Sequence, residues 1–253
     1  TGHAILDGIA PSLYNATTPQ SLGLHEAVAD LTAVLSGFFS HTLRRTVLEQ
    51  THGSIRYSTA FSSLAEEFGR AIDPSGRAGY LRSLSNNKTL ADVSRTEPHE
   101  LSEVLSGALY TVMVNLHEAM KRQFAEETGS SEFEVSFRAL GAAAKRFKSI
   151  IFRALDYLPP GEVTFADYGR AILAADQAAY PEAGQERQWI REEFVRRGIV
   201  ASADELDVET NFEHPAWKRW SPATGRPTSS PIAIGSCWAR RPTPRSGCGP
   251  GWT

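Results

Sequence analysis

The sequence predicts a mainly α-helical protein. Apolar residues recur at spacings of three and four from residue 22 to about residue 200, which is the period of a helix with one buried face. Pro and Gly clusters interrupt this pattern at intervals typical of helical domains. With 253 residues, of which 41% are apolar and 22% charged, the chain is long enough to bury a large core.

The first predicted element is a short one, because His3 to about Gly8 has the composition of the end of a helix. The helices that follow are predicted over residues 22–40, 42–50, 57–72, 99–127, 134–157, 165–178 and 184–198. The clearest of them is 99–127, in which a stripe of large apolar side chains should face other helices. That stripe consists of Leu101, Val104, Leu105, Leu109, Val112, Leu116, Met120 and Phe124.

Two regions break the helical pattern. Residues 73–98 are rich in Gly, Ser, Asn and Pro, and long irregular stretches in compact domains tend to carry function. Near the end of the chain we expect the helical lobe to span residues 1–200, followed by an irregular extension over 201–220. Residues 221–253 contain six Pro and five Gly and should form a disordered tail, which is either a genuine extension or the product of out-of-frame translation.

Charge and cysteine content exclude several classes of protein. The tail holds four Arg and no Asp or Glu, so residues 1–220 carry 22 basic and 29 acidic residues, a net charge of −7. This acidic body argues against nucleic acid as a partner. The cysteines, Cys237 and Cys248, form no CxxC pair and support neither a disulfide framework nor a thiolate metal site. SIIFRAL and TVMVNL are too short to span a membrane, so we predict no membrane association, and the compartment stays open.

The chain begins with Thr1-Gly2-His3, and Glu26 and Asp30 stand one helical turn apart 23 positions further on. A histidine followed at this distance by an E-x-x-x-D helix is the pattern of an HExxH zinc site that lacks its first histidine and its glutamate. Catalytic zinc takes three protein ligands and keeps one position open for water. We therefore predict His3 and Glu26 as zinc ligands, and Asp30 as a residue that orients a ligating imidazole.

Several stretches resemble the thermolysin-like zinc metallopeptidases, the gluzincins, in the order in which that family has them. TGHAILDG is similar to the end of the family's HExxH helix, and GLHEAVADLTAVL is similar to its glutamate-ligand helix. The resemblance implies a peptide or protein substrate, a Zn²⁺ cofactor and a lobe like the family's C-terminal α-helical domain. The segment RALDYLPPGEVTFADYGRAILAADQAAYP resembles the ending common in a bacterial branch of the family, although no chemistry can be assigned to it.

The same resemblance implies roles for three further residues. Tyr14, in SLYNATTP, corresponds to a tyrosine that hydrogen-bonds the tetrahedral intermediate, and Arg82, in LRSLSNN, to an arginine that holds a substrate carbonyl. His99, in PHELSEVLSGALY, corresponds to the histidine that stabilises the oxyanion. His25 is turned about 100° away from Glu26 on the helix and is expected to be structural or to line the pocket.

For His99 the choice of orienting acid, Glu97 or Asp92, stays open. On this interpretation His3 is the second histidine of an HETGH-type motif, and the first His and the Glu lie upstream of Thr1. The chain as printed should then bind zinc poorly and hydrolyse peptides negligibly, because it lacks one ligand and the general base.

Two other functions are compatible with the sequence. One is a catalytically dead helical interaction module in which the site residues are remnants, and the other is a zinc hydrolase that acts on substrates other than peptides.

Overall fold

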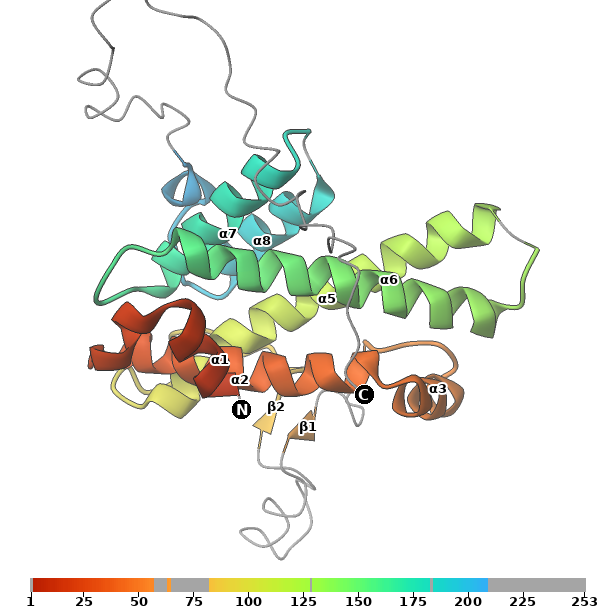
Figure 1. Cartoon of the computed structure of the whole chain (residues 1–253), viewed down its shortest axis with the longest axis horizontal. Coiled ribbons are helices and arrows are strands. Elements are labelled where there is room, and N and C mark those ends of the chain that lie inside the picture. The colour runs from red at the N-terminus through yellow and green to blue at the C-terminus, as the bar shows by residue number, and fades with distance from the viewer. Residues whose placement is uncertain (1, 57–62, 65–81, 128, 183, 209–253) are drawn as a thin grey trace, which may run out of the picture. The chain divides into compact units, whose positions relative to one another are not determined.

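The chain folds into a set of packed helices. The computed structural model describes residues 2–56, 63–64, 82–127, 129–182 and 184–208, which belong to a compact unit, Thr1–Val208, distinct from Glu209–Thr253. Its α-helices are α1 (Gly2–Ile9), α2 (Pro19–Phe39), α3 (His41–Gln50), α5 (Pro98–Glu127), α6 (Glu132–Arg153), α7 (Phe165–Ala179) and α8 (Gln185–Arg196) (Figure 1). The described residues also form the 3-10 helices η1 (Pro11–Asn15), η2 (Ala154–Tyr157) and η3 (Ala203–Leu206), the last of which follows α8. The predicted mainly α fold class is confirmed.

Most of the predicted helices lie within three residues of the observed ones. There are two exceptions: α6 ends at Arg153, four residues before the predicted end of 134–157, and 57–72 falls outside the described residues except at Ser63 and Leu64, where the prediction is wrong. These two residues form β1 (Ser63–Leu64), which pairs antiparallel with β2 (Arg82–Ser83). Pairing between segments distant in sequence overrides local helical preference here, as it often does for strands.

The irregular regions follow the prediction in part, since β2 lies within residues 73–98 and η3 within residues 201–220. Residues 84–97 contain turns and bends but no helix or strand. The predicted extension starts inside the compact unit, because η3 lies within it and Leu206 is fully buried. Residues 209–253, including the predicted tail, lie outside the described part of the chain.

Helices α2 and α5 form the centre of the core. The predicted apolar stripe of α5 is buried from Leu101 to Leu116, and α5 packs against α2, α6 and α8. In Figure 1, α5 runs diagonally from behind α2, and α6 crosses it near its middle. Glu26 and Asp30 therefore lie on one of the two helices that organise the core.

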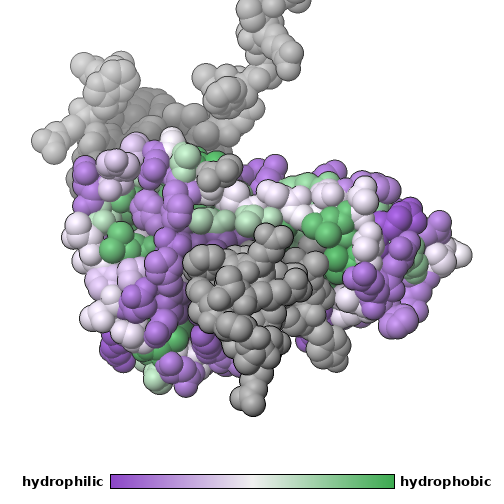
Figure 2. All heavy atoms as spheres, turned by 90° about the horizontal axis from the view of Figure 1, so that it is seen from below, coloured by the Kyte–Doolittle hydropathy of each residue, from purple (hydrophilic) through white to green (hydrophobic). Residues whose placement is uncertain are grey.

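By length and composition α2 is apolar enough to cross a membrane, which the sequence prediction had not recognised. The core helix of a globular protein has the same composition, and α2 packs against α1, α3, α5, α6 and α7. On the face shown in Figure 2, hydrophilic residues are interspersed with apolar ones. The apolar character of α2 thus agrees with its position in the core.

The beginning of α2 is fastened to a loop far along the chain. Both carboxylate oxygens of Glu162 accept hydrogen bonds: Oε1 from the Thr17 amide at 2.7 Å, and Oε2 from the Thr18 amide at 3.0 Å and the Thr18 hydroxyl at 2.6 Å. These bonds, the Thr18 hydroxyl first, lower the pKa of Glu162 to about 2. Ser21 Oγ adds two bonds to the backbone of Val163. The LPPGEVTF segment, to which the sequence assigned no chemistry, thereby fixes the residues that lead into α2.

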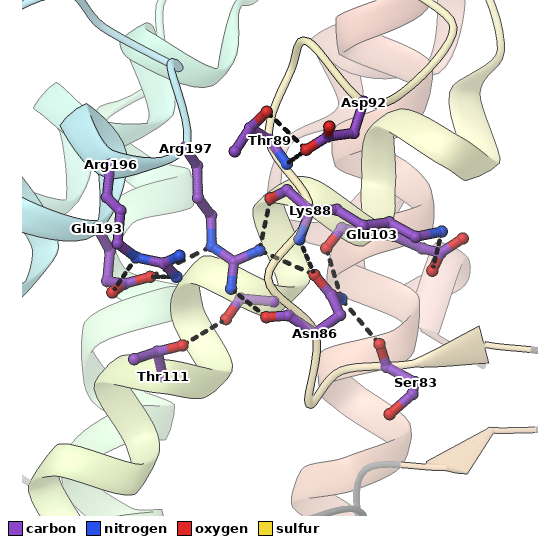
Figure 3. A network of polar contacts seen from close by, with 11 residues as sticks. Ser83, Asn86, Lys88, Thr89, Asp92, Glu103, Thr111, Glu193, Arg196 and Arg197 are labelled. Atoms are coloured by element: carbon purple, nitrogen blue, oxygen red, sulfur yellow. Dashed lines mark hydrogen bonds and ion pairs between the residues drawn. The ribbon is translucent and has the colours of Figure 1, made fainter.

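A buried arginine holds the segment after β2 in place (Figure 3). The guanidinium of Arg197, fully buried at the end of α8, donates to the Asn86 side chain and to the carbonyls of Asn86 and Lys88 at 2.7–2.9 Å. Its Nε also pairs with Glu193 at 3.2 Å. Gly107 on α5 leaves the space for this cluster, since a Cβ there would lie 2.8 Å from both Arg197 and Asn86. The loop that follows Arg82 is therefore fixed between α5 and α8.

Candidate active site

Three elements bring a carboxylate and two imidazoles together. Oε1 of Glu26, on α2, lies 3.6 Å from Nε2 of His3 on α1, and Oε2 lies 3.6 Å from Nε2 of His99 at the start of α5. Both separations are longer than a hydrogen bond. The carboxylate therefore faces one imidazole with each of its oxygens without bonding directly to either.

His3 reaches Glu26 because α1 and α2 cross at very short distance. A Cβ built on Gly2 would lie 2.4 Å from Cα of Ala29, so the two helix backbones meet at a point where only glycine fits. Gly2 immediately precedes His3, and Ala29 lies one turn after Glu26. The glycine of the TGH sequence thus sets the distance between the histidine and the carboxylate.

These side chains line a cavity of about 410 Å³. Its walls come from α1, η1, α2 and the start of α5. The lining consists of His3, Asp7, Leu13, Tyr14, Ala16, Leu22, His25, Glu26, Pro98 and His99. A volume of this size matches the lower range of small-molecule sites.

Tyr14 stands on the rim of the cavity. It lies in η1, and 72% of its surface is exposed. The residue before it, Leu13, is buried and anchors η1 to the core. The tyrosine predicted to contact the substrate therefore projects from a short, partly anchored segment.

Glu97, and not Asp92, contacts His99. Oε1 of Glu97 accepts hydrogen bonds from Nδ1 of His99 at 2.9 Å and from its backbone amide at 3.1 Å. The ring bond is the main cause that lowers the pKa of Glu97. Asp92 instead caps the turn at Thr89. Because a carboxylate only accepts, Nδ1 of His99 carries a proton and Nε2 faces Glu26.

His25 and Asp7 also line the site, and of the two the sequence analysis had not singled out Asp7. Nε2 of His25 bonds the Leu13 carbonyl at 3.2 Å, Nδ1 lies 4.0 Å from Oδ1 of Asp7, and the ring stacks on that of His3 with centroids 6.2 Å apart. The expectation that His25 is structural or pocket-lining agrees with this position. Asp7 gave one signal in the sequence, since it stands four positions after His3 and so shares its helical face.

The described contacts connect the remaining two predicted residues, Asp30 and Arg82, less directly with the site. Asp30 is buried on α2, and the described contacts of His3 are with Glu26 and His25, so its role as orienting residue stays a prediction. The backbone of Arg82 lies in β2, opposite Leu64. Its side chain is outside the described part of the structure, and its substrate contact also stays a prediction.

The donor atoms agree with part of a zinc site. Two ligands bound about 2.0–2.2 Å from a tetrahedral zinc lie roughly 3.3–3.6 Å apart, so His3 and Glu26 are spaced as two ligands of one ion. Within residues 2–208, gaps excepted, no group of three or more His, Cys, Asp or Glu is arranged to hold a metal. The described residues thus offer a suitable pair of donors but not a complete ligand set.

Comparison with known proteins found no match to a protein-family model, to a curated protein or to a solved structure. The geometry of the cavity is therefore the basis on which a function is proposed.

Proposed function

We propose that this chain is the α-helical lobe of a thermolysin-like zinc metallopeptidase, which hydrolyses peptide bonds with metal-activated water. The observation that carries the proposal is the position of Glu26 between His3 and His99, at 3.6 Å from each. A carboxylate and an imidazole at ligand spacing, beside a second imidazole that is held by its own acid, is an arrangement suited to metal-assisted hydrolysis.

His3 and Glu26 hold the metal in this proposal. Bound zinc would supply a Lewis acid that polarises the scissile carbonyl and the attacking water. Glu26 would supply the carboxylate ligand beside His3, and its second oxygen, Oε2, faces His99. Asp30, buried on the same helix, orients the ligands, and Arg82 holds the substrate carbonyl.

His99 and Tyr14 donate hydrogen bonds to the oxyanion. Nδ1 of His99 already donates to Glu97, so Nε2 can donate to the substrate only when the ring carries both protons. The loss of one such donor typically costs about 10²–10³ in rate.

The third ligand and the general base are assigned to the His and Glu of an HExxH motif in front of Thr1. A histidine four positions before His3 would lie on the same face of α1. An N-terminal Ala-Ala-Ala-His-Glu extension of this chain should therefore complete the site, and an extension of five alanines is the matched control.

Metal-free samples of the printed chain and of both extended chains are titrated with Zn²⁺ against a chromophoric chelator. We expect one equivalent at micromolar affinity or better for the His-Glu extension, and at least about tenfold weaker binding for the other two chains. Glu26→Gln and His3→Ala should abolish the gain, whereas His41→Ala, at an exposed position on α3, should not.

Activity is measured on a quenched-fluorescence peptide library with and without chelator. Chelator-sensitive cleavage by the His-Glu extension supports a peptidase, and cleavage of esters or small amides alone supports a different zinc hydrolase. Equal zinc affinities for the two extended chains would refute the proposed site and favour an interaction module.

A further inference from the structure

Apart from the buried side chain of Leu13, little within η1 fixes the position of Tyr14. η1 has only five residues, and no side chain caps its first turn. A 3-10 helix of this length is held by its surroundings more than by its own hydrogen bonds. Since 72% of the Tyr14 surface is exposed, packing of the ring itself contributes little.

Besides the buried Leu13 side chain, a hydrogen bond from a neighbouring helix fixes η1. Nε2 of His25 lies 3.2 Å from the carbonyl oxygen of Leu13, the residue immediately before Tyr14. A carbonyl only accepts, so Nε2 carries the proton and donates. The same oxygen accepts the backbone bond from Ala16 at 3.0 Å, which closes η1. The Leu13 carbonyl oxygen thus accepts both the bond that closes η1 and the bond from His25.

The ring of His25 is itself held in place, so it can fix the segment to which it is bonded. It is adjacent to Glu26 on α2, and only 14% of its side chain is exposed. The ring of His3 stacks on it at an interplanar angle of 23°, and Asp7 lies beside Nδ1. The ring is therefore confined by α1 on one side and bonded to η1 on the other.

We infer that His25 is a positioning residue that holds the Tyr14 segment over the Glu26 carboxylate. This inference rests on the proposed function, because a Tyr14 hydroxyl that donates to the oxyanion must be held at a fixed distance from it. His25 contacts neither the proposed metal nor the substrate; it acts through the backbone of Leu13.

Hydrogen exchange tests whether His25 holds η1 in place, and it needs no activity assay. In His25→Leu, the amides of Leu13 and Ala16 should exchange about tenfold faster or more, while the amides of α7 keep their wild-type rates and so report an intact fold. His25→Gln is the conservative variant, since its Nε2 also donates a hydrogen bond, and it should restore most of the protection. Unchanged protection in His25→Leu would overturn the inference.

The catalytic part is tested in the His-Glu extended chain. His25→Leu should lower kcat at least about tenfold with KM changed less than twofold, as expected when a donor to the transition state is misplaced. His25→Gln should recover kcat. If exchange rises but kcat does not fall, Tyr14 needs no fixed position and the inference fails. Absence of zinc uptake by the extended chain would instead refute the proposed function, and the exchange result would still decide whether His25 holds η1.

Discussion

At the scale of single residues, Gly2 decides whether the site exists. Its Cα hydrogens occupy a space in which a methyl group would meet the Ala29 backbone at 2.4 Å. Backbone atoms cannot yield as a flexible side chain does, so α1 would have to move away from α2 and carry His3 with it.

Gly2→Ala should therefore destabilise the protein by about 1–3 kcal/mol, the usual cost of overpacking. In the His-Glu extended chain it should also weaken zinc binding. Gly8→Ala is the matched control on the same helix, because nothing lies within 4 Å of its Cβ position. Alanine there should stabilise by up to about 1 kcal/mol. Urea denaturation of both variants checks the pair, and equal effects would show that the crossing tolerates a methyl group.

A second residue, His117, couples stability to pH. It is fully buried on α5, where Nε2 contacts the carbonyl and the hydroxyl of Ser136, and burial is the main cause that lowers its pKa from 6.5 to about 4. Nearby Lys121 acts in the same direction. The folded state thus favours the neutral ring.

Since the unfolded chain binds this proton more readily, the contribution of His117 is complete above pH 6.5 and is lost as the pH falls toward 4. The loss over that window should be about 3 kcal/mol. Denaturation curves at pH 7.5 and pH 4 measure it. His117→Gln should show a smaller difference between the two pH values, and the same difference in both proteins would contradict the assignment.

How far the sequence predicts the site depends on the residue. His3, Glu26 and His99 come from three helices whose order and spacing are visible in the sequence, and the structure brings them together. Helical periodicity tells which face of α2 His25 occupies, but not that η1 folds across that face. The choice of Glu97 over Asp92 likewise depends on a turn whose geometry has no periodic signal.

At the scale of elements, the long helices were predictable because each buries a stripe repeated over several turns. The three 3-10 helices and the pair of two-residue strands were not, since elements this short are decided by contacts with the rest of the fold. The loop after β2 illustrates this: Arg197 holds it from more than 100 residues away.

Arg197→Met should cost about 3–5 kcal/mol, because it leaves the buried acceptors of Asn86 and Lys88 without their donor, at about 1–3 kcal/mol for each, while Glu193 keeps Arg196 as a partner. Burial lowers the pKa of this arginine, because it disfavours the charged guanidinium. The hydrogen bonds of the guanidinium offset part of that cost. Arg196→Met is the neighbouring control: its side chain is 41% exposed, and its ion pair with Glu193 should be worth at most about 1 kcal/mol. Thermal and urea unfolding compare the two, and a cost below about 1 kcal/mol for Arg197→Met would rule out an anchoring role.

At the scale of the whole molecule, the described core belongs to one compact unit, Thr1–Val208. That nucleic acid is not a partner, as the acidic balance of residues 1–220 favours, stays a prediction. The boundary at Val208 lies beyond Leu206, whose burial ties η3 to α7 and α8.

A chain that ends at Val208 should therefore keep the helical circular dichroism and the urea midpoint of the full chain. It should also keep the response to zinc when it carries the His-Glu extension. A clear fall in the midpoint would show that Glu209–Thr253 contributes to the stability of the first unit.

The bonds from Thr17 and Thr18 to Glu162 have a consequence for how the molecule is made. They join positions 144 and 145 residues apart, and Ser21 and Val163 add a contact of similar span. Closing so large a loop is slow compared with forming a helix. During synthesis, the start of α2 therefore cannot form these bonds until residues 162 and 163 have left the ribosome. The cavity should be among the last parts of the protein to be completed.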